Sequence, residues 1–238
     1  RKTLEKAAET MAEQPLSAED RLAAGDNPTI AALHETHPLR DGISPSQPQR
    51  FKVERPKSSF AAWYQFFPRS EGATIDPNTG KIIQGTLKTS MAGLERAAAE
   101  GFDIVYLPPV FPIGVTNRKG RNNTLVAGPD DPGSPFGIGS ELGGHDTVDP
   151  LLGTMDDFKA LCQRAHELGL EIALDFALQC SPDHPWVKAH PNWFRHKPDG
   201  SIAFAENPPK KYQDIYPIDF NADMPGIEKE VERIMNLW

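Results

Sequence analysis

Apolar and polar positions alternate along the chain in a way that predicts a parallel sheet covered by helices. Apolar side chains dominate residues 59–67, 102–107 and 170–178, which have the lengths expected of strands. Between them, residues 86–100 and 154–168 carry apolar positions every three or four residues, the period of a helix with one buried face. Strands that alternate with helices of this length are typical of βαβ units. The pattern therefore predicts an α/β protein.

Signals at the helix ends support these boundaries. Thr154 and Asp157 have the spacing of a capping box at the start of the second helix, and Gly169 stands where that helix should end. Gly101 has the corresponding position after the first helix.

The beginning of the chain has a different character. Residues 1–36 are rich in Ala and Glu and hold two short helical patterns, the second opened by Ser17 with Asp20 three residues later. The stretch that follows carries four prolines with Gly, Ser and Asp, a composition that interrupts both helices and strand ladders. We expect residues 1–54 to form a helical appendage with a proline-rich connecting strap, and residues 55–238 to form part of a catalytic domain.

Two segments of the second domain are too long for ordinary βα connections. They are residues 108–153, after the second strand, and residues 179–224, after the third. Long loops at the carboxyl ends of parallel strands usually carry function. Three strands alone are compatible with an open doubly wound sheet as well as with a (β/α) barrel, and the loop lengths favour the barrel.

Composition narrows the function classes. The net charge of −8 argues against non-specific nucleic-acid binding, and two cysteines without paired spacing indicate neither a disulfide framework nor a cysteine-based zinc site. The chain has no long apolar run and no signal-peptide pattern, so we expect a cytoplasmic protein that does not enter a membrane. Because there is no initiator Met and Trp238 lies within a helical pattern, we also expect both ends to continue in a longer protein.

The third apolar run ends in polar side chains with two possible interpretations each. Asp175 lies near its carboxyl end, where burial without a partner would be costly. It either binds substrate or holds a catalytic group at a barrel mouth, or it caps a loop. Gln179 follows on the same side and either hydrogen-bonds sugar hydroxyls or holds the loop backbone.

The tightest basic clusters of this acidic chain fall in the two long loops. They are RKGRNN at 118–123 and the Lys pair within ENPPKKYQDIY at 206–216. A phosphate dianion needs several cationic or hydrogen-bonding donors that converge on it, and Lys serves this purpose as readily as Arg. The clusters therefore indicate a phosphorylated sugar as ligand, or else they are solvated loop tips.

Residues 102–216 resemble the α-amylase superfamily, glycoside hydrolase family 13. The general marks are FDIVYLPPVFP and HDTVDPLLGTMDDFKALCQRAHELGLEIALD. Within it, KGRNN, AGPDDPGSPFGIGSELGGHD, DFALQCSPDHPW and AENPPKKYQDIYP resemble the maltosyltransferases that use α-maltose 1-phosphate. The resemblance implies an α-amylase-type (β/α)₈ TIM barrel, of which this chain holds about the first three βα units.

The resemblance also implies an activity. Such enzymes move a maltosyl unit from α-maltose 1-phosphate to the non-reducing end of an α-1,4-glucan, with retention of configuration and release of phosphate. Their nucleophile and acid/base carboxyl would lie beyond Trp238, so no catalytic residue is assigned within this chain, which alone should be inactive. Two alternatives stay open, a hydrolase or transglycosylase of neutral α-glucans and a truncated carbohydrate-binding module. Similar enzymes are often homodimers.

The resemblance assigns binding roles to individual residues. The maltosyl hydroxyls would meet Lys119 and Gln179. The phosphate would be surrounded by Ser134, Asn207, Lys210 and Tyr212. Supporting roles would fall to Asp175, His145 and Asp214. Amylases commonly place Asn-His where Gln179 and Cys180 stand, and that Asn helps to hold calcium, so no metal is expected. No cofactor is expected either, because the glycines over 137–143 imitate a dinucleotide fingerprint without the following helix.

Overall fold

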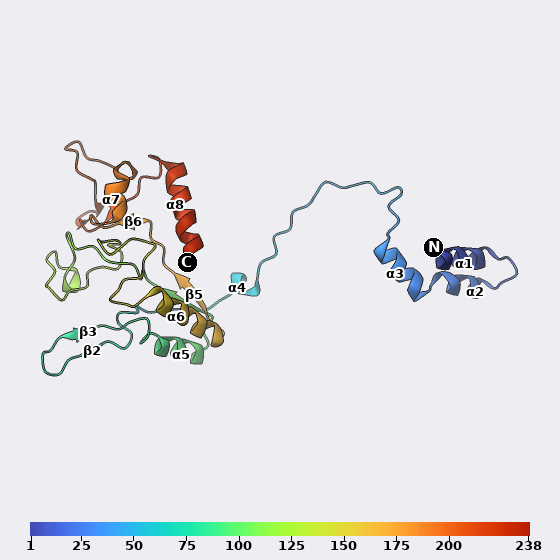
Figure 1. Ribbon diagram of the computed structural model, residues 1–238, viewed down its shortest axis with the longest axis horizontal. Helices are drawn as coiled ribbons and strands as arrows, with labels where there is room; N and C mark the ends of the chain where they lie inside the picture. Colours follow the sequence, from blue (N-terminus) through green and yellow to red (C-terminus); the bar gives the residue numbers. More distant parts are fainter. The chain divides into compact units, whose positions relative to one another are not determined.

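The computed structural model describes residues 1–238 and divides the chain into two compact units. The first is Arg1–Val53 and the second is Glu54–Trp238 (Figure 1). Each unit is described separately.

The first unit is helical. It contains α1 (Lys2–Ala12), α2 (Ala18–Gly25) and α3 (Pro28–Thr36). As the sequence predicts, Ser17 caps α2, and its side chain accepts a hydrogen bond from the Asp20 amide at 3.1 Å. The third helix was not expected. It begins at Asn27, which caps it through the Thr29 amide, and a proline at its first position supplies a helix-compatible φ.

The second unit is built on a parallel three-stranded sheet. Its strands are β1 (Trp63–Gln65), β4 (Ile104–Leu107) and β5 (Glu171–Leu174), in the order β1-β4-β5. Two helices cover it, α5 (Met91–Ala99) and α6 (Met155–Glu167); they pack against each other, and α6 also packs on β5 (Figure 1). The predicted α/β class with parallel strands is thus confirmed.

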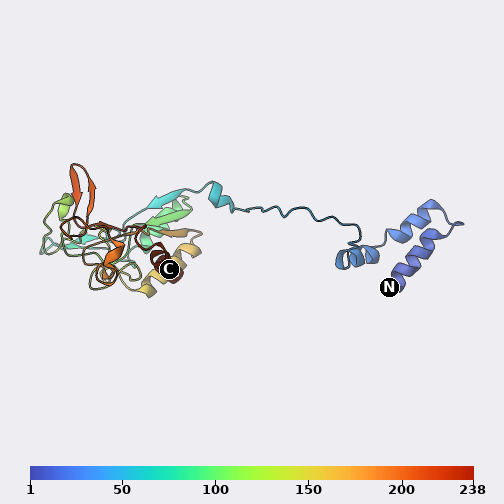
Figure 2. The ribbon, with the colours of Figure 1, turned by 90° about the horizontal axis from the view of Figure 1, so that it is seen from above.

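The remaining elements are short and lie mostly in the long loops. Three antiparallel pairs occur: β2 (Thr74–Ile75) with β3 (Ile82–Ile83), β6 (Gln179–Cys180) with β9 (Tyr216–Pro217), and β7 (Ala205–Asn207) with β8 (Lys210–Tyr212). The other helices are α4 (Pro56–Ser59), α7 (Pro185–Ala189) and α8 (Met224–Leu237), with 3₁₀ turns at Arg121–Asn123 and Pro191–Trp193. Figure 2 shows the β7–β8 hairpin as a projection from the rest of its unit.

The second unit has two hydrophobic clusters. One lies between the sheet and its helices, where Leu94, Val105 and Leu161 are fully buried. The other surrounds α7 and α8 and includes Trp193. Trp238, at the end of α8, packs against both clusters, so α8 joins the loop region to the sheet.

The third strand is shorter and less buried than its sequence predicts. β5 covers only Glu171–Leu174 of the apolar run 170–178, and all four of its residues are half-buried. The reason is its place at the edge of the sheet, where only β4 pairs with it. An apolar strand with an open edge is typical of a sheet that receives a further strand.

Replacing Thr154 by Ala is expected to lower the free energy of unfolding of this unit by about 1 kcal/mol. Thr154 and Asp157 form the predicted capping box: the Thr154 side chain accepts from the Asp157 amide at 3.2 Å, and the Asp157 carboxylate accepts from the Thr154 amide at 2.9 Å. Urea unfolding measures the loss. The control Lys159→Ala, at an exposed position of the same helix, should change stability by less than about 0.5 kcal/mol. Equal losses in both variants would contradict the role of the cap.

Candidate functional site

The candidate site residues lie in loops that leave one edge of the sheet. β4 ends at Leu107 and β5 at Leu174, and because the strands are parallel, both following loops start at the same edge. The carboxyl edge of a parallel α/β sheet is where such folds place ligands.

Lys119 and Asp214, from the two different loops, face each other in the interior. The Lys119 ammonium lies 3.7 Å from Asp214 Oδ1, and each residue is only 5% exposed. Asp214 Oδ1 accepts no hydrogen bond, although it is buried. Ser134 and Asp214 line the same narrow gap. The structure therefore brings together Lys119, Asp214 and Ser134, and it leaves one buried acceptor with unused capacity.

The other basic residues of the 118–123 cluster have structural partners. Arg118 donates to the backbone carbonyls of Gly114 at 2.7 Å and Ile113 at 3.0 Å, so it holds its own loop in shape. Arg121 is exposed and lies 3.4 Å from Asp131. Lys119 is the buried residue of this cluster, and Arg118 is half-buried.

The second basic cluster forms the β7–β8 hairpin. Asn207 pairs with Lys210 across the hairpin, and Tyr212 pairs two positions further along, opposite Ala205. Because side chains alternate along a strand and cross-strand partners share a face, Asn207, Lys210 and Tyr212 lie on one face. Lys211 lies on the opposite face. The three side chains of the first face make no hydrogen bond within the chain.

Gln179 joins the two long loops. Its side-chain amide donates to the Phe136 carbonyl at 3.0 Å, and its backbone amide donates to the Ala177 carbonyl at 2.9 Å. Its side-chain oxygen accepts no hydrogen bond within the chain. The two interpretations from the sequence are therefore compatible, since one end of the amide holds the loop and the other is unengaged.

Asp175 is held by a neighbour on the adjacent strand. The Tyr106 hydroxyl donates to Asp175 Oδ2, and this hydrogen bond, with burial and the carboxylate charge, raises the pKa of Tyr106 to about 12. The sequence analysis missed Tyr106. The register of the sheet could have found it, since Tyr106 pairs with Ala173, two residues before Asp175 and hence on the same face.

His145 belongs to a buried chain of hydrogen bonds whose proton positions follow from its donors. The Trp186 amide donates to His184 Nδ1 at 3.0 Å, so the proton of neutral His184 is on Nε2. That Nε2–H donates to His145 Nδ1 at 3.0 Å, and His145 Nε2–H then donates to the Ala177 carbonyl at 2.8 Å. The Ala177 carbonyl oxygen thus accepts hydrogen bonds from the His145 ring and from the Gln179 backbone amide.

Both imidazoles are held neutral. Burial, together with the nearby His145, lowers the pKa of His184 to about 3. Burial also lowers the pKa of His145. His184 was not singled out from the sequence, because its partner is 39 residues away.

Two glycines of the loop that imitates a dinucleotide fingerprint, Gly139 and the adjoining Gly144, pack against His184. Gly139 has φ +101°, and a Cβ at this position would lie 2.2 Å from His184 Cδ2. A Cβ on Gly144 would lie 2.5 Å from His184 Nε2. The loop therefore passes directly over the imidazole, which only residues without a side chain permit.

The structure contains no cluster of three or more His, Cys, Asp or Glu side chains arranged to hold a metal ion. None of its helices has the length and apolar character needed to cross a membrane.

Comparisons with known proteins identify relatives of this chain. No family model matches the chain. The α-1,4-glucan:maltose-1-phosphate maltosyltransferase of Bifidobacterium longum is 99% identical over 238 residues, which are 100% of this chain and 32% of that protein. Its counterpart in Bifidobacterium animalis is 76% identical over 238 residues, again 100% of this chain and 32% of that protein. An α-amylase structure from Lactobacillus plantarum, 29% identical, aligns with a TM-score of 0.54 over 74% of this chain and 35% of its own.

The resemblance expected from the sequence is thereby confirmed. The chain is homologous to these maltosyltransferases along its whole length, and it spans about a third of theirs. Its partial likeness to an α-amylase fits the parallel α/β fold. The roles of the individual binding residues stay predictions.

Proposed function

Since the chain matches α-1,4-glucan:maltose-1-phosphate maltosyltransferases from end to end, we propose that it supplies the donor-binding loops of such an enzyme. The complete enzyme transfers a maltosyl unit from α-maltose 1-phosphate to an α-1,4-glucan. The three-stranded sheet is then the first part of a (β/α)₈ barrel, and the open edge of β5 receives the next strand.

The observation that carries this proposal is the first face of the β7–β8 hairpin. It presents the Lys210 ammonium, the Asn207 amide and the Tyr212 hydroxyl together, and no group of the chain engages them. A phosphate dianion is the ligand that such a set of donors suits, because charge-assisted hydrogen bonds to it are strong. A neutral glucan would leave the Lys210 charge without a counterpart.

The buried groups beside the hairpin suit the sugar part of the donor. The side-chain oxygen of Gln179 accepts no hydrogen bond within the chain, and the Lys119 ammonium makes none either, although it lies 3.7 Å from Asp214 Oδ1. Sugar hydroxyls both donate and accept, so they suit these two groups. We assign Lys119 and Gln179 to the maltosyl hydroxyls and Ser134 to the phosphate, with Asp175, His145 and Asp214 as supports of the loops that carry them.

The chain orients the donor but does not perform the chemistry. Retaining transfer needs a carboxylate nucleophile that displaces phosphate from the anomeric carbon, and a carboxylic acid close to it that protonates the leaving oxygen. The 4-hydroxyl of the glucan then displaces the enzyme carboxylate and gives its proton to the same acid/base. Two inversions preserve the α configuration. Both carboxyl groups are expected outside residues 1–238.

Replacing Lys210 by Ala in the complete gene product is expected to raise the KM for α-maltose 1-phosphate at least about tenfold, because the phosphate loses one charge-assisted contact. Phosphorus NMR, which follows release of inorganic phosphate in the presence of maltohexaose, measures the effect. Lys211→Ala is the matched control, since Lys211 is the next residue on the same strand but lies on the opposite face.

Two outcomes would contradict the proposal. If Lys210→Ala and Lys211→Ala changed the KM for α-maltose 1-phosphate equally, the first face of the hairpin would not be the phosphate site. If wild-type protein releases no phosphate while it cleaves or disproportionates maltohexaose, the protein is an amylase-type enzyme that uses neutral glucans.

A further inference from the structure

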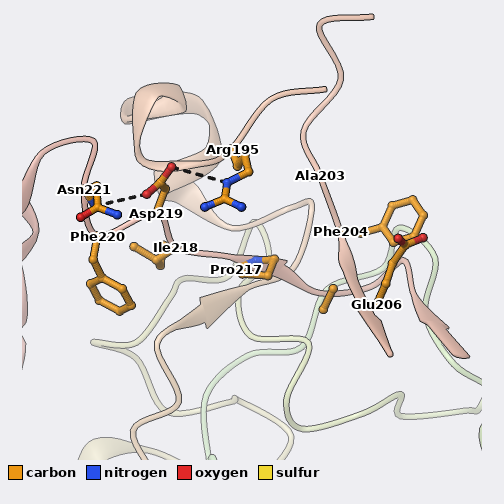
Figure 3. A pocket seen from close by; sticks show the side chains of 10 residues that line it. Arg195, Ala203, Phe204, Glu206, Pro217, Ile218, Asp219, Phe220 and Asn221 are labelled. Atoms are coloured by element: carbon orange, nitrogen blue, oxygen red, sulfur yellow. Dashed lines mark hydrogen bonds and ion pairs between the residues drawn. The ribbon is translucent and has the colours of Figure 1, made fainter. Parts of the chain in front are cut away.

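A hollow of about 440 Å³ lies where β7 meets the segment before α8 (Figure 3). Residues 205 and 206 of β7 form one wall, and residues 217–221 form another. Backbone hydrogen bonds hold the walls, from the Ala203 amide to the Arg195 carbonyl at 2.8 Å and from the Asp219 amide to the Trp193 carbonyl at 2.8 Å. Its volume is within the range of small-molecule sites.

Polar side chains with unused hydrogen-bonding capacity surround this hollow. Arg195 Nε lies 3.8 Å from Asp219 Oδ2, and the guanidinium makes no hydrogen bond within the chain. Asp219 Oδ1 accepts from the Asn221 backbone amide at 3.2 Å, while the Asn221 side chain is unengaged. Figure 3 shows Arg195, Asp219 and Asn221 together on one side and Glu206 on the other, so a ligand between them would meet donors and acceptors from two directions.

Two phenyl rings add flat apolar surface at the two sides of the hollow, Phe220 below Asn221 and Phe204 beside Glu206 (Figure 3). Phe220 is 42% exposed, although its neighbour Ile218 is buried. Phe204 carries the Lys197 ammonium 4.1 Å from its ring centroid, which fixes the ring beside Glu206. Apolar rings with a few placed polar groups suit a ligand that has both C–H faces and hydroxyls, as a sugar does.

The charges around the hollow balance. Arg195 and Lys197, whose ammonium lies over the Phe204 ring, contribute two positive charges, and Glu206 and Asp219 contribute two negative ones. A hollow without excess positive charge suits a neutral ligand better than a phosphate dianion. The hairpin face with Lys210 has an unpaired positive charge instead. The two neighbouring sites therefore differ in the charge of the ligand they suit.

We infer that this hollow binds a segment of neutral α-glucan and so holds the acceptor chain near the donor loops. The glucan identity of the ligand rests on the proposed function, whereas the preference for a neutral polyhydroxylated ligand follows from the lining. The hollow opens to solvent where Pro217 and Asn221 are exposed, so a chain longer than the hollow can extend beyond it.

Electrophoresis of the complete gene product in gels that contain glycogen, without α-maltose 1-phosphate, tests the inference. Phe220→Ala and Arg195→Ala are each expected to raise the apparent Kd for glycogen at least about fivefold. Both side chains are partly exposed, so the variants should fold, and circular dichroism checks this. Phe60→Ala, an exposed phenylalanine in the same unit, is the matched control and should leave the Kd unchanged. Since the ligand is neutral, the Kd should not depend on salt.

The inference is overturned if Phe220→Ala and Arg195→Ala retain wild-type retardation, or if Phe60→Ala loses as much. Failure of the proposed function gives a different result. In that case phosphate release is absent from wild-type protein in the NMR assay, while retardation by glycogen still depends on Phe220.

Discussion

Acidification from pH 7 to pH 4 is expected to lower the stability of the Glu54–Trp238 unit by about 3 kcal/mol through His184 alone. Its pKa is about 3 in the folded chain, mainly because burial disfavours the charged imidazole, against an ordinary value of 6.5. Between these values the unfolded chain binds a proton that the folded chain does not. Stability therefore falls as the pH drops through 6.5, and the loss levels off near pH 3.

Urea unfolding followed by tryptophan fluorescence at intervals from pH 7.5 to pH 4 measures this dependence. The depressed pKa of Asp183 also costs stability in acid, because hydrogen bonds from Val115 and Thr116 outweigh its burial, but that loss begins only near the ordinary carboxylate pKa. The interval from pH 7 to pH 5 thus reports on the histidines. His184→Gln should be less stable at pH 7 and should depend less on pH there. A flat wild-type profile over this interval would contradict the buried neutral pair.

Replacing Gly139 by Ala is expected to cost about 4 kcal/mol of stability, from backbone strain and from overpacking together. Gly139 has φ +101°, and the added Cβ would lie 2.2 Å from His184 Cδ2. The imidazole cannot move aside cheaply, because the Trp186 amide and His145 hold both of its nitrogens. Urea unfolding measures the loss.

Gly169→Ala is the matched control for this substitution. Gly169 has φ +78°, and nothing lies within 4 Å of the Cβ it would gain, so only strain of about 1 kcal/mol is expected. If both variants lost the same stability, backbone strain alone would account for the loss in Gly139→Ala. The predicted clash of the added Cβ with His184 would then be wrong.

Much of the local structure was predictable because its causes are local. The capping box of Thr154 and Asp157 was predicted, since its partners are three residues apart and both hydrogen bonds form within one turn. The parallel sheet was predicted from apolar runs separated by amphipathic helices. The length of its third strand was not predicted correctly. The edge position of β5, which shortens and half exposes it, depends on which strands pair rather than on its own sequence.

The sequence by itself determined the α/β class, both ends of α6, the likeness to maltosyltransferases and the candidate residues in two long loops, whereas α5 begins at Met91 and not at residue 86 as predicted. Only the tertiary structure decided which side chains meet. Asp214 faces Lys119 from the other loop, Tyr106 donates to Asp175 across 69 residues, and His184 reaches His145 across 39. Such pairs form because parallel strands deliver distant loops to one edge of the sheet, a consequence of pairing that no local pattern of residues contains.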